Sequence, residues 1–124
     1  MSRRPRDIGT AGETAARRWL QSDGWPDADR QPLRGTRDCG DLIVCRSPRI
    51  IAECKAGNAA ETASSGLIGQ WLAQTETERV NAGAVLAVLI VRRHRRPVGL
   101  WDAPWSLRAS LQDWSAMAKA WADQ

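Results

Sequence analysis

Residues 41–55 read D-L-I-V-C-R-S-P-R-I-I-A-E-C-K, and the interpretation of the whole chain depends on this stretch. Two short apolar runs flank the turn signal R-S-P-R at 46–49, a pattern typical of a β-hairpin. Successive side chains on a strand point to opposite faces, so Glu53 and Lys55 should share one face, and the paired strand should bring Asp41 beside them. Burying such charges is unfavourable unless they pair or bind a metal, so the hairpin is predicted to carry a functional site.

The chain has 124 residues, the usual size of one domain. We expect residues 1–9 to form a flexible basic arm and residues 10–124 to form a single domain. The longest apolar run, at 84–91, is far shorter than the roughly 20 residues that span a membrane, and the basic start of the chain does not resemble a secretory signal. Three cysteines without zinc-like spacing indicate reduced thiols and a cytoplasmic location.

Basic residues exceed acidic ones, and most of them are arginines. The formal net charge is +4, and 16 of the 18 basic residues are arginines because lysine occurs only at positions 55 and 119. Two explanations remain open: the planar guanidinium suits phosphate binding, and a GC-rich genome also favours arginine codons. In a chain that otherwise uses arginine, the compact ammonium of Lys55 is informative about the site.

The segments before the hairpin predict a helix, an irregular segment and a polar loop. Thr10 and Glu13 match a capping box, which predicts a helix from Thr10 to about residue 22. Capping is therefore an alternative role for Glu13. Residues 25–33 are predicted to be irregular or an edge strand. The loop at 34–40 leads directly into Asp41.

Three arginines in this part of the chain are candidates for DNA binding: Arg34 and Arg37 in the loop, and Arg17 on the first helix. Loops at such positions often carry binding residues. A solvated turn is an equal alternative for each loop arginine. Asp38, also in the loop, is an alternative to Asp41 as the functional carboxylate.

The segments after the hairpin predict a βαβ crossover. A helix is expected over about 63–81, interrupted near Gly66 and Gly69, with a stop signal at 81–83. The continuous apolar run at 84–91 predicts a central strand that is buried on both faces. The basic run at 92–97 is either a solvated turn or a phosphate contact, and its single histidine is predicted to be a surface residue.

The last segment predicts a short strand at 98–101 and a C-terminal helix that begins at Pro104. Apolar residues recur in this helix at alternating spacings of four and three. They are Leu107, Leu111, Trp114, Ala118 and Trp121. This stripe packs either on the sheet or on a second subunit.

The predicted site has the residue types that divalent-metal chemistry requires. The carboxylates of Glu13, Asp41 and Glu53 are hard ligands suited to Mg²⁺, with Mn²⁺ as a substitute. Such a metal polarises a phosphodiester and activates water, and Lys55 is placed to orient that water or to offset transition-state charge. The sequence contains no glycine-rich phosphate loop, no Ser–His pair motif and no zinc cluster, so these chemistries are not predicted.

The order of these motifs resembles the PD-(D/E)XK nuclease superfamily. Glu13 lies on a first helix, G-D-L-I-V follows at 40–44, and I-I-A-E-C-K follows at 50–55. The likeness covers about residues 10–101. Gly40 stands where the superfamily has its name-giving proline, a position that varies among these nucleases. The chain is most similar to the archaeal-type Holliday junction resolvases or to a phage-borne relative of them, which implies the cytoplasm of a bacterium or of a phage-infected host cell.

The resemblance implies an α/β fold with an αβββαβ core, that is, a mixed central sheet flanked by helices, here with an extra C-terminal helix. It implies that Asp41 and Glu53 bind the metal, that Lys55 is the catalytic lysine, and that Glu13 is the first-helix carboxylate. Gln70 matches the position of a helix glutamine near the site.

The expected function is metal-dependent cleavage of branched DNA by a homodimer, with the tryptophan-rich C-terminal helix as the candidate interface. Two alternatives stay open. One is another nuclease of the same superfamily that acts on linear, damaged or modified DNA, as restriction and repair enzymes do. The other is a module that binds nucleic acid without cleaving it. A shared core supports a nuclease more firmly than it supports any one substrate.

Overall fold

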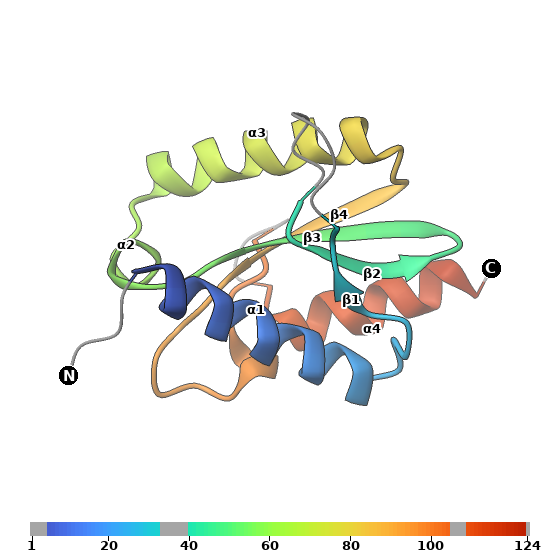
Figure 1. The fold of residues 1–124 in the computed structure, drawn as a ribbon, viewed down its shortest axis with the longest axis horizontal. Coiled ribbons are helices and arrows are strands. Elements are labelled where there is room, and N and C mark those ends of the chain that lie inside the picture. The colour runs from blue at the N-terminus through green and yellow to red at the C-terminus, as the bar shows by residue number, and fades with distance from the viewer. Residues whose placement is uncertain (1–4, 33–39, 105–108, 124) are drawn as a thin grey trace.

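The computed structural model describes residues 5–32, 40–104 and 109–123. In chain order the elements are α1 (Pro5–Ser22), β1 (Asp29–Arg30), β2 (Leu42–Arg46), β3 (Arg49–Lys55), α2 (Asn58–Glu61), α3 (Ser65–Ala82), β4 (Leu86–Val91), the 3₁₀ helix η1 (Val98–Leu100) and α4 (Leu111–Ala122), as Figure 1 shows. The strands form a four-stranded mixed sheet in the order β1-β2-β3-β4. The α/β class and the αβββαβ order expected from the sequence are therefore observed.

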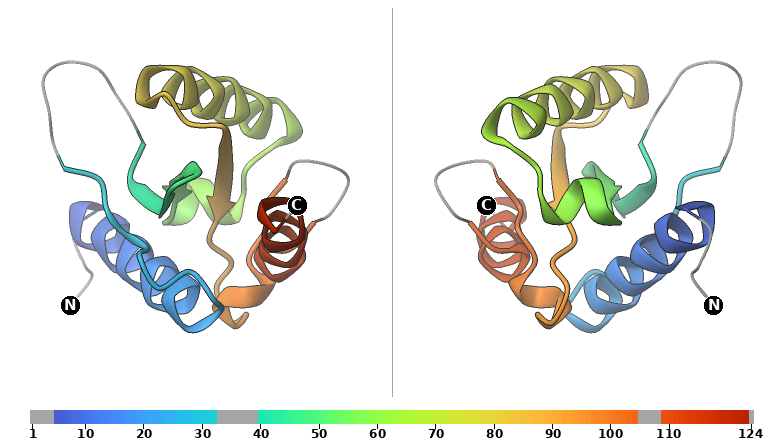
Figure 2. Two further views of the ribbon diagram at one scale, coloured as in Figure 1. Left: turned by 90° about the vertical axis from the view of Figure 1, so that its right-hand side faces the viewer. Right: turned by 90° about the vertical axis from the view of Figure 1, so that its left-hand side faces the viewer.

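Helices cover both faces of the sheet: α3 lies on one side, and α1 and α4 lie on the other (Figures 1 and 2). The strands explain this division, because alternate residues point to opposite faces. In β4, Val88 and Ile90 belong to the core cluster shared with α1 and α4, whereas Leu89 and Val91 pack with α3. A strand with helices on both faces reads as a continuous apolar run, as 84–91 does.

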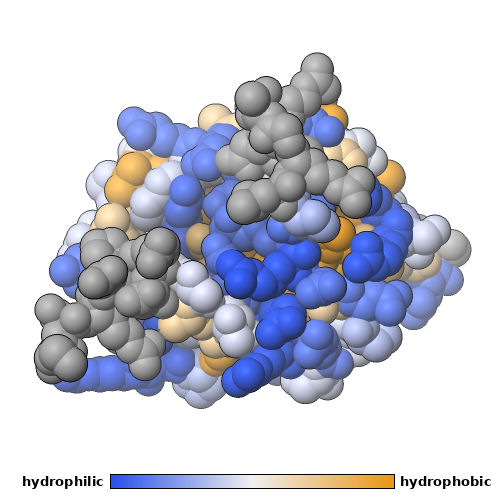
Figure 3. Space-filling model, in the orientation of Figure 1, coloured by the Kyte–Doolittle hydropathy of each residue, from blue (hydrophilic) through white to orange (hydrophobic). Residues whose placement is uncertain are grey.

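None of the helices in the described part of the chain is long and apolar enough to cross a membrane. Hydrophilic residues predominate on the face that carries α1 and β1 (Figure 3).

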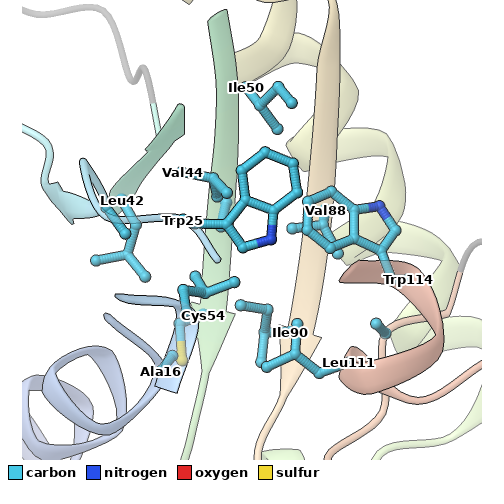
Figure 4. Packing of buried hydrophobic residues seen from close by; sticks show 14 of the residues in the cluster. Ala16, Trp25, Leu42, Val44, Ile50, Cys54, Val88, Ile90, Leu111 and Trp114 are labelled. Carbon is cyan, nitrogen blue, oxygen red and sulfur yellow. The ribbon is translucent and has the colours of Figure 1, made fainter. Parts of the chain in front are cut away.

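Two tryptophans form the centre of the larger core cluster (Figure 4). The rings of Trp25 and Trp114 are stacked, with centroids 6.1 Å apart. Trp25 Nε1 donates a hydrogen bond to Ser115 Oγ at 2.8 Å, which satisfies the one polar atom of its buried ring. Leu111, Trp114 and Ala118 are buried here, so most of the predicted stripe of α4 packs on the sheet. Trp121 is 43% exposed, and Leu107 lies outside the described residues.

The hairpin and the crossover are confirmed. Strands β2 and β3 are antiparallel and are joined at residues 47 and 48, with one irregularity between Ile43 and Cys45. Strands β3 and β4 are parallel and are connected through α3. The expected edge strand before the hairpin is β1, which pairs only two of its residues with β2. Cys45 and Cys54 are free thiols, and Cys39 lies outside the described residues.

The start of the first helix was predicted wrongly. Helix α1 begins at Pro5, not at Thr10, so residues 5–9 are helical and Thr10 and Glu13 do not form a capping box. Proline is favoured in the first turn of a helix, where its missing N–H is not needed. Gly9 does not stop the helix, because one interior glycine costs only about 1 kcal/mol. The first four residues of the expected arm lie outside the described residues.

Three further predictions need correction. β4 lies at an edge of the sheet rather than at its centre, although helices cover both of its faces. The expected strand at 98–101 is the 3₁₀ helix η1, and Asp102 forms the bridge to Val91 instead. Helix α4 begins at Leu111, where Ser110 and Asp113 form a capping box, instead of at Pro104. Asp102 also forms a bridge with Ser110, so the residue directly before α4 is extended.

Helix α3 is continuous, without the break expected at its two glycines. It begins after the N-cap Ser64, whose Oγ accepts a hydrogen bond from the backbone N–H of Leu67, and it ends at Gly83 in the left-handed conformation. Capping at both ends offsets the low helix propensity of the interior glycines.

Candidate functional site

Asp41 is held against β3 by two hydrogen bonds. Its backbone N–H donates to the carbonyl of Ala52 at 3.0 Å, and its carboxylate Oδ2 accepts from the backbone N–H of Cys54 at 2.9 Å. These two partners are the residues on either side of Glu53. The pairing of Asp41 with β3 therefore places its carboxylate next to the side chain of Glu53.

Glu53 and Lys55 lie on the face of β3 that α3 covers. Glu53 is 5% exposed, and the Nζ of Lys55 is 4.0 Å from its Oε1. The same Nζ lies 5.6 Å from the centre of the Trp71 ring on α3, a cation–π distance. The ammonium is thus directed toward Glu53 and Trp71 and is not free in solvent, since the Lys55 side chain is 24% exposed.

Sequence reasoning missed a further carboxylate, that of Glu78 on α3. Glu78 is 1% exposed, and its carboxyl group lies close enough to that of Glu53 to raise the pKa of Glu53. The available signal was the helical stripe of residues 67, 71, 74 and 78, which places Glu78 on the same face as Trp71. A glutamate on the face of a helix that packs against a sheet has to be neutralised or paired.

The carboxyl groups of Asp41, Glu53 and Glu78 cannot all be ionised unless a positive charge offsets their repulsion. Burial raises the pKa of Glu53 far above its ordinary value of 4.5, and contact with the carboxyl groups of Glu78 and Asp41 raises the pKa further. The buried Oε2 of Glu53 accepts no hydrogen bond from an N–H group of the described residues. Either a proton or a bound cation therefore has to neutralise this cluster.

Glu13 lies near Asp41 but does not join Glu53. It is on α1, which packs on the opposite face of the sheet, and its Oε2 is 3.2 Å from Nη2 of Arg30. Burial and the charge of Asp41 raise the pKa of Glu13, and Arg30 lowers it. Asp41 thus stands between Glu13 on one side and Glu53 with Glu78 on the other.

Over residues 5–32, 40–104 and 109–123, no three His, Cys, Asp or Glu side chains are grouped so that they could hold a metal ion. The expected trio of Glu13, Asp41 and Glu53 is therefore not assembled. The pair Asp41 and Glu53 still fits a small divalent cation, because Mg²⁺ usually takes one or two carboxylates and fills its remaining positions with water and substrate oxygens. The uncompensated Oε2 of Glu53 is the observation that favours a cation at this pair.

The remaining site candidates lie away from this pair or outside the described residues. Gln70 is exposed on α3, whereas Thr75 and Glu78 are buried on that helix. Arg17 lies beside Asp29 on β1, with Nη1 at 3.8 Å from Oδ1. Arg34, Arg37 and Asp38 lie outside the described residues.

A stability measurement can test whether the turn before Asp41 requires glycine at position 40. Its φ is +90°, and an added Cβ would lie 3.2 Å from the carbonyl oxygen of Ala52 and 3.4 Å from Oε2 of Glu78. Replacement by alanine is expected to lower the free energy of unfolding by about 1–2 kcal/mol, because a left-handed backbone disfavours a Cβ. Urea unfolding measures the change.

The matched control is Gly69→Ala on α3, where an added Cβ meets no atom within 4 Å. This substitution is expected to raise the free energy of unfolding by about 0.5–1 kcal/mol, since alanine is the better helix former. A Gly40→Ala protein whose free energy of unfolding equals or exceeds that of the wild type would show that the turn before Asp41 tolerates a side chain.

The chain was compared with protein-family models, with curated proteins and with solved structures, and none of them matches it.

Proposed function

We propose that this chain is a divalent-metal-dependent endonuclease that hydrolyses phosphodiester bonds in DNA, with branched DNA such as a Holliday junction as its substrate. One observation carries the proposal: Asp41 and Glu53 present adjacent carboxyl groups, and the ammonium of Lys55 lies 4.0 Å from Glu53. This arrangement has the residue types of the nucleases that the sequence resembles.

Asp41 and Glu53 would hold Mg²⁺, and Mn²⁺ would substitute for it. When bound, the cation supplies Lewis-acid polarisation of the phosphodiester and lowers the pKa of a coordinated water. The backbone N–H of Cys54 fixes the orientation of the Asp41 carboxylate at 2.9 Å. Burial of Glu53 leaves few competing waters around its carboxyl group, which strengthens its electrostatic interactions.

Lys55 has the position of a charge-stabilising residue. Its ammonium is held between the carboxyl group of Glu53 and the ring of Trp71. From there it can donate a hydrogen bond to an attacking water and offset the negative charge that develops on the phosphoryl oxygens. Because the side chain is partly exposed, a phosphate can reach this ammonium without rearrangement of the core.

The proposed substrate is branched DNA, and the proposed active form is a homodimer. A four-way junction has paired strands to cut, so two copies related by a twofold axis fit it. Met117 and Trp121 are large apolar side chains that remain 39% and 43% exposed on α4, which supports this helix as the interface.

The experiment is cleavage of a synthetic four-way junction and of linear duplexes with the same arm sequences, in Mg²⁺ and in EDTA. We expect cleavage only with the metal, and a rate on the junction at least about tenfold above that on the duplexes. Equal rates on both substrates would point to a restriction- or repair-type endonuclease. Binding without cleavage in both Mg²⁺ and Mn²⁺ would contradict the proposal.

A further inference from the structure

Helix α1 and strand β1 lie side by side and are joined by a ladder of polar contacts. Positions one helical turn apart on α1 meet successive residues of the β1 segment. The contacts are Gln21 Nε2 donating to the Ala28 carbonyl at 2.8 Å, Arg17 Nη1 beside Asp29 Oδ1 at 3.8 Å, and Arg30 Nη2 beside Glu13 Oε2 at 3.2 Å. This ladder sets the positions of two guanidinium groups along the open edge of the sheet.

A third guanidinium joins them from β2. Arg46 Nη2 lies 3.8 Å from Oδ2 of Asp29, so Arg17 and Arg46 approach the same carboxylate from two elements. Both distances are long, and the side chain of Asp29 is 54% exposed. Exposed ion pairs of this kind contribute about 0–1 kcal/mol, so a phosphate can replace Asp29 as the partner at little cost.

The hydrogen-bonding capacity of these arginines is not used up within the protein. Arg30 and Arg46 are 53% and 56% exposed. The side chain of Arg17 is 28% exposed, and its Nη1 lies 3.8 Å from Oδ1 of Asp29, which is too far for a hydrogen bond. Guanidinium groups with unused donors favour phosphate oxygens, which they can bind in a bidentate manner.

Strand β1, which carries Arg30, is linked to Asp41 of the proposed catalytic site. Arg30 pairs in register with Leu42, the residue after Asp41, and the N–H of Gln31 donates to the carbonyl of Asp41 at 2.8 Å. Arg46 lies at the other end of β2, but its guanidinium group reaches back to Asp29, the residue before Arg30. The three guanidinium groups therefore gather beside the two residues of β1.

We propose that Arg17, Arg30 and Arg46 form one track that binds the sugar–phosphate backbone of the nucleic-acid strand whose next phosphate reaches Asp41 and Glu53. The inference rests on the proposed nuclease function and names the surface that carries its substrate. It fits the hydrophilic face over α1 and β1 (Figure 3). The track binds without regard to base sequence, because its contacts are to the backbone alone.

The test is binding of fluorescein-labelled DNA in EDTA, followed by anisotropy over a range of salt concentrations. For Arg17→Gln, Arg30→Gln and Arg46→Gln, the slope of log K against log salt is expected to fall by about 0.9 for each phosphate contact that is lost. Arg46→Lys is expected to keep most of the slope, because it retains the charge.

Arg18→Gln is the matched control. Arg18 is exposed on the same helix, but one residue on from Arg17 and therefore about 100° around it. The Arg18→Gln variant loses the same charge as the track variants, and its slope of log K against log salt is expected to equal that of the wild type. Unchanged slopes in all three track variants, or an equal fall in the control, would overturn the inference.

The experiments distinguish a wrong assignment of the arginine track from a wrong assignment of the nuclease function. A wild-type protein that cleaves in Mg²⁺ while the track variants bind with unaltered slopes would remove the track and keep the nuclease. A wild-type protein that never cleaves, but whose slope falls in the track variants and not in Arg18→Gln, would remove the nuclease and support a backbone-binding surface.

Discussion

Replacing Glu53 by glutamine is expected to lower the rate of Mg²⁺-dependent strand cleavage by about 100-fold or more, which is the usual loss when one electrostatic group of an active site is removed. Glutamine keeps the shape of the side chain but cannot carry the negative charge that a divalent cation requires. Binding of DNA in EDTA should be unchanged, since the metal-free Glu53 already holds a proton and glutamine is likewise neutral. Single-turnover cleavage of a junction in saturating Mg²⁺ measures the effect.

Glu76→Gln is the control for this prediction. Glu76 lies on α3, two residues before Glu78, but it is exposed and pairs with Arg79 at 2.6 Å. It loses the same charge outside the site and is expected to cleave at the wild-type rate. Lys55→Met should show a loss of similar size to Glu53→Gln. A Glu53→Gln protein that cleaves as fast as the control would remove Glu53 from the mechanism.

The stability of the metal-free protein is expected to fall as the pH rises above about 5. Burial and the neighbouring carboxyl groups raise the pKa of Glu53 in the folded state, whereas the unfolded chain has the ordinary value of 4.5. Below that value both states hold the proton. Above it the unfolded state releases a proton that the folded state keeps, so each further pH unit favours unfolding until the raised pKa is passed.

For one retained proton, the free energy of unfolding is expected to fall by up to about 1.4 kcal/mol per pH unit. Glu13, whose pKa is also raised, contributes in the same direction. Glu76 does not contribute between pH 5 and 9, because hydrogen bonds from Arg79 lower its pKa and it is ionised in both the folded and the unfolded state over this range. Urea unfolding in EDTA at several pH values between 5 and 9 measures the slope.

Two comparisons identify Glu53 as the source of this slope. Glu53→Gln should flatten the dependence, and Glu76→Gln should not. Mg²⁺ should also flatten it, because a cation that replaces the shared proton stabilises the folded state by about 2.7 kcal/mol at 100 times its dissociation constant. Wild-type stability that stays level or rises between pH 5 and 9 in EDTA would show that the cluster holds no extra proton.

Local sequence signals determined the hairpin, the strand that is covered on both faces, and the position of Asp41 beside Glu53. The apolar runs on both sides of the turn at 46–49 specify the hairpin, because the short turn between them fixes the register in which the two strands pair. The apolar run at 84–91 specifies a strand covered on both faces. The hairpin also places Asp41 opposite the backbone of β3 beside Glu53, so this part of the candidate site was predictable from strand pairing alone.

Only the tertiary structure decided which side chains join Glu53 and which lie apart from it. Glu78 joins Glu53 because α3 packs over that face of the sheet, and Glu13 stands apart because α1 packs over the other. A sequence pattern shows which residues share a face of their own element, but it does not show which face of the sheet each helix covers. The contacts of Arg17 with Asp29 and of Arg30 with Glu13 depend in the same way on packing, because they join residues 12 and 17 positions apart in the chain.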